Sequence, residues 1–210
     1  MRVIILCLGL LASGCASETQ TPSEPAKVIE TLLGVLSSDG RRVCVDAKTQ
    51  GKPLAVFSTM IVAPRPSRRP LQWQIPKPLR PPGPLSNREL YEDEFARARI
   101  LLEKPVNARD VLPPEQQLQL NSVARTLAAV GDVERVSIAN SPKRPLIVAR
   151  WWLANRVRPL CVPNFTISNP VVAREIAFVS VTGGHWGTTY AFRKRGDRWA
   201  PHAQWTTWLY

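Results

Sequence analysis

The last fifty residues of the chain consist of short apolar or alternating runs that are separated by turn-forming residues. Gly, Asn, Pro and Asp lie between the runs, which is typical of strands joined by tight turns. Strands are therefore predicted at 160–167, 171–181, 188–194 and 198–208. Upstream, the same reasoning predicts strands at 41–47 and 54–62 and a hairpin formed by 133–139 and 145–153.

Three segments have the spacing of apolar residues that one face of a helix requires. They are 25–38, which Ser23 is placed to cap, 86–103, which opens with the capping box Ser86-Asn87-Arg88-Glu89, and 113–130. Strands and helices occur in separate blocks, so the expected class is α+β. We expect a curved antiparallel meander sheet of about five to seven strands, packed with three helices.

A proline-rich segment at 63–85 interrupts this pattern with eight prolines. Such density excludes helix and central strand, because each proline lacks a backbone donor. Basic and apolar side chains alternate with the prolines, among them Arg65, Arg68, Arg69 and Trp73. Two interpretations remain: an extended strap whose Trp and Leu side chains pack on the domain, which we favour, or a docking segment for an anionic or protein partner.

The N-terminus has a charged start and then an apolar run of nine residues, Val3 to Leu11. The run is shorter than the ~20 residues that a membrane-spanning helix needs. It ends in Leu11-Ala12-Ser13-Gly14-Cys15, which resembles the lipobox of bacterial lipoproteins, although Ala12 stands where that family most often has Leu. The alternative is an ordinary secretory signal in which Cys15 is incidental.

The resemblance implies that residues 1–14 are a signal peptide and that Cys15 carries the acyl chains. A small, polar tether at 15–24 and a single domain at 25–210 would follow. The implied location is the periplasmic face of the bacterial envelope. The absence of Asp after Cys15 favours the outer membrane over the inner.

Two cysteines remain after such processing, Cys44 and Cys161. In an oxidising compartment, we expect them to form a disulfide. The alternative is two buried free thiols. The chain contains no CxxC motif, so its sequence supports neither a redox-active pair nor a structural zinc site.

The C-terminal fifty residues carry a second, less specific resemblance. Ser168-Asn169-Pro170, Gly196-Asp197-Arg198-Trp199 and Trp208 are similar to the C-terminal pattern of small bacterial envelope proteins of uncharacterised role. This resemblance implies a curved antiparallel sheet and no activity.

Motifs for catalysis are few. The chain has two histidines, His185 and His202, which make a poor metal site, so we expect no metal. It has neither GxSxG nor SxxK, the two commonest motifs of envelope serine hydrolases. It also has neither GxGxxG nor a P-loop, so we expect no cofactor. Gly183-Gly184-His185-Trp186-Gly187 is a candidate anion or ligand loop, because its glycines can present backbone donors and His185 lies beside an aromatic residue. Its other interpretation is a plain hairpin loop.

The net charge of +12 favours an anionic partner. Export to the envelope would exclude nucleic acid and leave a protein or an anionic polymer such as lipopolysaccharide. A basic surface that only aids solubility is the other interpretation. We therefore expect a non-catalytic envelope lipoprotein, the alternative being a periplasmic hydrolase that uses His185 or His202.

Overall fold

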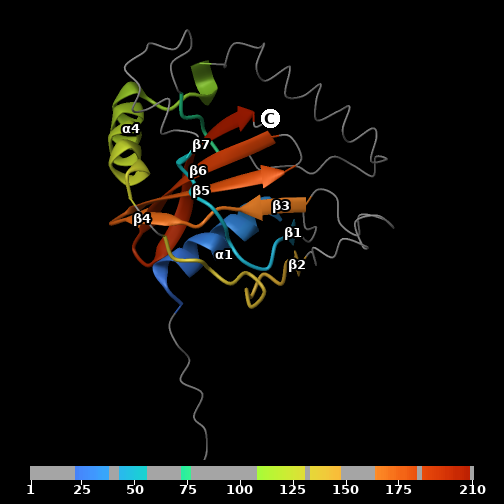
Figure 1. The fold of residues 1–210 in the computed structure, drawn as a ribbon. Coiled ribbons are helices and arrows are strands. Elements are labelled where there is room, and N and C mark those ends of the chain that lie inside the picture. The colour runs from blue at the N-terminus through green and yellow to red at the C-terminus, as the bar shows by residue number, and fades with distance from the viewer. Residues whose placement is uncertain are drawn as a thin grey trace, which may run out of the picture.

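The computed structural model describes residues 22–37, 43–55, 72–76, 108–130, 133–147, 164–183 and 186–208. Its helices are α1 (Glu24–Leu36), the short 3-10 helix η1 (Ala108–Asp110) and α4 (Pro114–Ala128). Its strands are β1 (Cys44–Val45), β2 (Leu146–Ile147), β3 (Asn164–Ile167), β4 (Val171–Ala173), β5 (Ile176–Gly183), β6 (Trp186–Arg195) and β7 (Arg198–Trp208) (Figure 1). These elements confirm the α+β class.

The described strands form one open sheet in the order β2-β1-β3-β5-β6-β7, with β4 also paired to β5. The prediction of an antiparallel meander is right for β3 to β7 and wrong for the remainder. β1 pairs in parallel with both β2 and β3, so the sheet is mixed. Consequently β2 does not form the predicted hairpin with 133–139, where Ser137 bridges Lys48 instead.

β3 and β4 lie end to end along the same edge of β5. The pairs Ile167↔Val181 and Val171↔Phe178 leave three residues, 168–170, opposite two residues of β5. This bulge is closed by Ser168 N–H, which donates to Ser180 O at 2.8 Å. The predicted single strand at 171–181 is wrong, because a tight turn at Arg174–Glu175 divides it and Arg174 adopts a φ of +50°.

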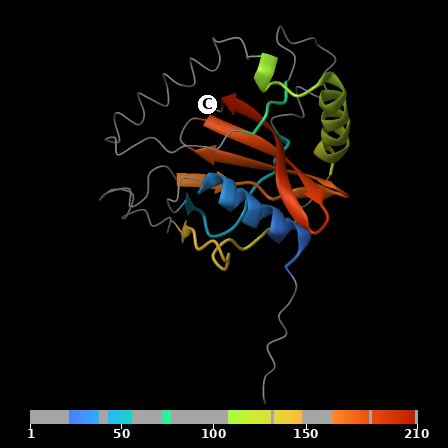
Figure 2. The ribbon, with the colours of Figure 1, turned by 180° about the vertical axis from the view of Figure 1, so that it is seen from behind.

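The sheet is covered on both faces. Along β5, Ala177, Val179 and Val181 join the core cluster that contains α1. The alternate residues Ile176 and Phe178 join a second cluster with α4. α1 lies behind the sheet in Figure 1 and in front of it in Figure 2, as this alternation requires.

The two helices confirm the predictions at 25–38 and 113–130, whereas the predicted helix at 86–103 lies outside the described residues. Ser23 caps α1 as expected, since its side chain accepts from Ala26 N–H. Within the described ranges, neither helix is long and apolar enough to cross a membrane.

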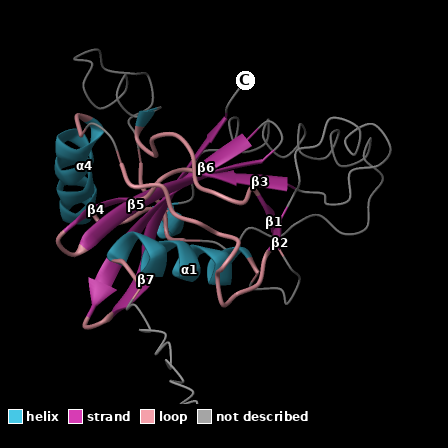
Figure 3. Cartoon of the chain, turned by 60° about the horizontal axis from the view of Figure 1, so that its bottom comes forward, coloured by secondary structure: helices cyan, strands magenta, loops and turns pink. Residues whose placement is uncertain are grey.

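A compact ion-pair network joins the start of α1 to the β6–β7 hairpin, where α1 runs alongside β7 (Figure 3). The Glu24 carboxylate accepts from Lys194 Nζ at 2.9 Å, Lys27 Nζ at 3.0 Å and Trp199 Nε1 at 2.9 Å. Lys27 also pairs with Asp197 in the hairpin turn at 3.1 Å. Hydrogen bonds from Lys194 and then Lys27, with a smaller contribution from Trp199, lower the pKa of Glu24 to about 2.

The network predicts a pH-dependent effect of Glu24→Gln on folding. Because the folded-state pKa of Glu24 lies below its ordinary value of 4.5, its stabilisation is complete above that value. It is lost as the pH falls toward about 2. We expect the variant to be less stable than the parent at pH 7 and the difference to shrink below pH 4.5, as measured by urea denaturation across the pH range.

Glu30→Gln on the same helix is the matched control, because Glu30 has no ion pair with another described residue. Its effect on the free energy of unfolding should not show this loss between pH 4.5 and about 2. A Glu24→Gln effect that stays constant down to pH 2 would mean that the network does not hold α1 to the hairpin.

Candidate functional site

A cavity of about 170 Å³ opens on the sheet between the ends of β3, β5 and β6 and the segment Gln50–Pro53. Ser180 and Thr182 follow Phe178 at two-residue steps, so they continue the face that carries α4. Hydroxyl groups dominate the side chains at the cavity. They belong to Thr166, Ser168, Ser180, Thr182, Thr188 and Thr189. Thr188 pairs with Val181, whose side chain joins the cluster under α1, so the Thr188 side chain lies on that face of the sheet. Gln50 and Lys52 add an amide and an ammonium group.

The cavity exists because the side chains on this part of the sheet are small. Gly187 pairs with Thr182, and Thr189 pairs with Ser180, where Ala191 and Phe178 are paired further along the same two strands. The apolar layer under α4 therefore stops at Phe178. Beyond it, short polar side chains leave space that the segment 50–53 closes on one side.

Backbone hydrogen bonds hold this segment on the sheet. Gln50 N–H donates to Ile167 O at 2.9 Å, and Asn169 N–H donates to Gly51 O at 3.0 Å. Gly51 adopts a φ of +79°, which a residue with a side chain rarely does, and so allows the chain to turn here. The segment 43–55, cyan in Figure 1, consequently runs across the strands and forms a wall of the cavity.

The hydroxyl groups at the base of the cavity are already ordered by the fold. Ser180 Oγ donates to Pro53 O at 2.7 Å and lies 2.6 Å from Thr189 Oγ1. Ser168 Oγ accepts from Ser180 N–H at 2.8 Å. Thr166 Oγ1 donates to the Asp46 carboxylate at 2.9 Å. These side chains are thus held in position before any ligand arrives.

A buried layer of polar groups supports the same wall. Thr49 Oγ1 donates to Asn169 Oδ1 at 2.7 Å and accepts from Val136 N–H at 2.8 Å. Asp46, which is only 7% exposed, also accepts from Gln50 Nε2 at 3.1 Å. Burial makes these hydrogen bonds costly to break, so the wall is a rigid part of the domain.

The predicted ligand loop only borders this cavity. Gly183 and Trp186 form the last pair of β5 and β6, and Gly184 and His185 lie outside the described residues. Of the predicted loop, Gly187 lines the cavity. The hydroxyl groups of the cavity were not among the predicted site residues, although the change from apolar to polar residues along β5 was the available signal.

The predicted cysteine sites are tested only in part. Cys44 in β1 is disulfide-bonded, and its partner lies outside the described residues. The pairing with Cys161 therefore stays a prediction. Cys15 also lies outside the described residues, so its lipidation stays a prediction too.

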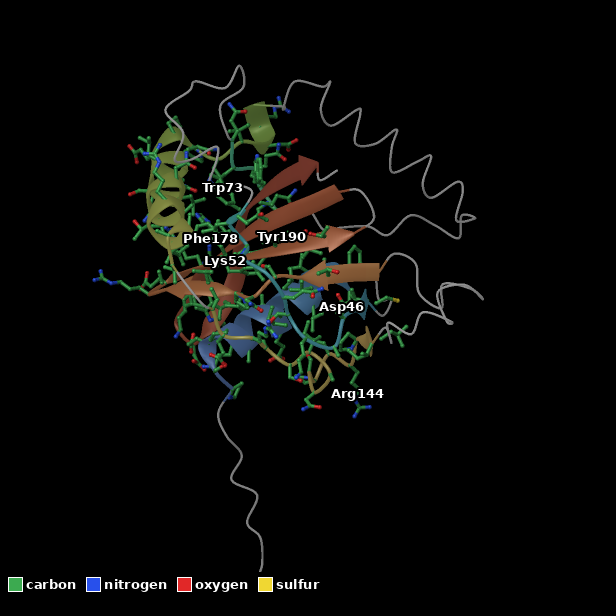
Figure 4. The ribbon with its side chains drawn as sticks, viewed as in Figure 1. Asp46, Lys52, Trp73, Arg144, Phe178 and Tyr190 are labelled. Atoms are coloured by element: carbon green, nitrogen blue, oxygen red, sulfur yellow. The ribbon has the colours of Figure 1, made fainter. Side chains whose placement is uncertain are left out.

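Trp73 is the described member of the predicted basic strap site, since Arg65, Arg68 and Arg69 lie outside the described residues. Its indole is fully buried, with the ring 5.6 Å from that of Phe178 (Figure 4). Trp73 Nε1 donates to Asn121 Oδ1 at 2.9 Å, and the Gln117 amide both accepts from Trp73 N–H and donates to its carbonyl. The strap is therefore packed into the domain at Trp73, whereas Gln72 and Ile75 beside it are exposed.

Basic side chains gather where the β4–β5 and β6–β7 turns meet, which Lys194 N–H joins by donating to Glu175 O at 2.8 Å. We call Arg174, Arg195 and Arg198 the hairpin-end patch. All three are exposed, and none has a carboxylate partner within the described ranges. Nearby, Arg193 donates to Gln119 Oε1 of α4 at 2.8 Å.

His202, one of the two candidate catalytic bases, lies beside this patch in the β6–β7 bulge. Its Nε2 atom is buried and has no hydrogen-bond partner among the residues that the structure describes. Partial burial, together with the positive charges of Arg193 and Arg195, lowers the pKa of His202. In the described ranges no three His, Cys, Asp or Glu residues are grouped in a way that suits a metal ion.

Trp73 provides a test of whether the strap is structural. Replacing a fully buried Trp with Ala leaves a large cavity, so Trp73→Ala should lower the free energy of unfolding by about 3–5 kcal/mol. Trp73→Phe keeps a ring against Phe178 but loses the hydrogen bond to Asn121, so its free energy of unfolding should lie between those of the parent and Trp73→Ala. Urea denaturation of the three proteins measures these differences.

Leu118→Ala is the control, because Leu118 is 71% exposed on the same helix that contacts Trp73. Its effect should stay within about 0.5 kcal/mol. If Trp73→Ala were equally mild, Trp73 would be free to serve as a docking side chain.

No protein-family model, no curated protein and no solved structure matches this chain. Its function is therefore argued from its own residues and their geometry.

Proposed function

We propose that this chain is a lipid-anchored protein of the bacterial cell envelope whose domain binds an anionic envelope component without turning it over. The sequence from Leu11 to Cys15 supports the anchor. The observation that carries the binding role is the hairpin-end patch, whose guanidinium groups are exposed and have no acidic partner within the described ranges. Such groups form strong, charge-assisted hydrogen bonds with phosphate or carboxylate.

The hydroxyl-lined cavity also supports binding over catalysis. A serine or threonine nucleophile needs an adjacent base to remove its proton. Here the proton of Ser180 is directed to Pro53 O, a carbonyl oxygen that cannot act as a base. The Asp46 carboxylate that accepts from Thr166 also accepts from Gln50, so it holds the cavity wall in place. These groups fit a structural and ligand-ordering role.

The second candidate for the ligand is a protein partner in the envelope. A disulfide between Cys44 and Cys161 would stabilise the domain in this oxidising compartment. The predicted helix at 86–103 would complete the three-helix arrangement. The enzymatic alternative assigns the base to His185 or His202. For His202, the nearby charges that lower its pKa are cations, which would oppose its gaining a proton as a base must.

Cys15→Ser tests the anchor. Lipoprotein acylation takes place on the cysteine sulfur, so the variant should incorporate no labelled palmitate, whereas the parent should do so. The parent should also remain with outer-membrane vesicles after a high-salt wash, and removal of the acyl chains should prevent this. Cys44→Ser is the matched control and should keep the label. Loss of label from both variants, or from neither, would contradict the assignment of Cys15.

The hairpin-end patch predicts salt-sensitive binding of an anionic glycolipid headgroup. We expect the full-length protein, in neutral detergent, to bind deacylated lipopolysaccharide. Replacing Arg174, Arg195 and Arg198 by Gln should weaken the affinity at least about tenfold. Isothermal titration calorimetry at low and high salt measures both effects, and affinity should fall as salt rises.

The control replaces Lys48, Arg135 and Lys143 by Gln, which removes the same charge from exposed sites elsewhere. Equal weakening by both triple variants would show that only net charge matters. No binding by the parent would exclude this anionic partner.

A further inference from the structure

The cavity between Gln50–Pro53 and the ends of β5 and β6 has a pattern of hydrogen-bonding groups that selects its ligand. A hydroxyl group has one proton to donate and two lone pairs with which to accept. Where the protein already uses the proton, only lone pairs remain for a ligand. Hydrogen bonds within the protein account for the protons of four cavity hydroxyls, those of Thr166, Ser168, Ser180 and Thr189.

Three of these protons go to carbonyl or carboxylate oxygens, which can only accept. Ser180 donates to Pro53 O at 2.7 Å and Thr166 donates to the Asp46 carboxylate at 2.9 Å. Ser168 donates to Asn169 O, at a longer 3.3 Å. A carbonyl or carboxylate oxygen carries no proton, so the direction of each bond is settled.

The direction of the fourth proton, that of Thr189, follows from the direction of the Ser180 proton. Ser180 Oγ and Thr189 Oγ1 lie 2.6 Å apart, and either oxygen by itself is able to donate. Because the Ser180 proton is directed to Pro53 O, Thr189 must be the donor in this pair. All four hydroxyls can therefore offer a ligand only lone pairs, and the ligand must supply donors.

Three other groups at the cavity can donate. The Gln50 amide has two N–H protons and directs one of them to Asp46 at 3.1 Å. The Thr182 hydroxyl has no partner within the described ranges, and Lys52 Nζ makes a long contact of 3.3 Å with Val130 O. The ammonium group of Lys52 disfavours a cationic ligand by like-charge repulsion. A ligand that matches the whole cavity is therefore neutral and carries both donors and acceptors.

We propose that this cavity binds one sugar ring of a neutral glycan through the hydroxyl oxygens of Thr166, Ser168, Ser180, Thr182 and Thr189. Sugar hydroxyls donate and accept, as this arrangement requires. An acceptor-only ligand such as sulfate or carboxylate would face four oxygens that have no proton to give it. The ring would lie between two walls of the cavity, the sheet at Gly187 and the segment that carries Lys52. The Lys52 side chain is labelled in Figure 4.

The size of the cavity agrees with one ring. Its volume of about 170 Å³ equals that of about six water molecules in the liquid. A hexose displaces a similar amount of water, whereas a chain of sugars would extend into solvent. The inference deepens the proposed function, since it rests on the domain being a binding module and names the chemical class that this cavity takes.

Saturation-transfer NMR on the full-length protein in neutral detergent tests the inference. The probes are methyl β-glucopyranoside, methyl β-galactopyranoside and N-acetylglucosamine, with sulfate as the acceptor-only comparison and ethanolamine as the cationic comparison. We expect at least one sugar to bind saturably with a dissociation constant on the order of 1 mM, and neither comparison to displace it.

Two variants assign the binding to this cavity. Thr182→Val removes the free donor at nearly constant shape and should weaken sugar binding about tenfold. Gly187→Val places a side chain at the cavity wall and should abolish it, while a β-branched residue suits the extended strand. Thr126→Val, on an exposed position of α4, is the matched control and should leave binding unchanged.

The inference would be overturned if no sugar bound, if sulfate or ethanolamine displaced the sugar, or if Thr182→Val bound the sugar as tightly as the parent. Such results would leave the proposed function intact if the parent still bound deacylated lipopolysaccharide through the hairpin-end patch. Failure of the lipopolysaccharide experiment with sugar binding retained would remove the anionic partner and keep the sugar site.

Discussion

The burial of β5 on both of its faces is the constraint on which the domain depends. Each residue from Ile176 to Gly183 pairs with β6, and the side chains alternate between a cluster under α1 and a cluster under α4. A strand in this position has to be apolar at nearly every residue, because a polar side chain on either face would lose its water. Ser180 and Thr182 depart from this rule, and the cavity lies where they do.

The polar side chains at the cavity are compensated for their loss of water by hydrogen bonds to elements that are remote in sequence. Ser180 is 127 residues from Pro53, whose carbonyl accepts its proton, and Thr166 is 120 residues from Asp46. The bulge at 168–170 brings Asn169 to Thr49 and Gly51, so the segment 50–53 is held against the sheet. Polar groups that would destabilise a covered strand therefore become an ordered, solvent-accessible wall.

The opposite ends of β5 and β6 have different chemistry. At the β6–β7 turn, Glu24 balances Lys194 and Lys27, and this network ties α1 to the sheet. The exposed arginines of the hairpin-end patch have no such partner within the described ranges. Together with the cavity, the patch gives the domain one surface of exposed arginines and one surface lined by hydroxyl groups, and in the function that we propose these would contact different parts of a glycolipid or glycan ligand.

Local sequence determined the elements whose signals lie within a few residues. The cap at Ser23, the apolar spacing of α1 and α4, and Gly196 with its φ of +60° in the β6–β7 turn each act over one turn of chain. Tertiary structure decided the parallel pairing of β1 and the burial of Trp73, because each depends on a remote strand or helix. The cavity belongs with these. A serine or threonine looks the same in the sequence whether it faces solvent, a core or a ligand. Only the segment that packs against it decides whether its hydroxyl proton is used within the protein or is left for a ligand.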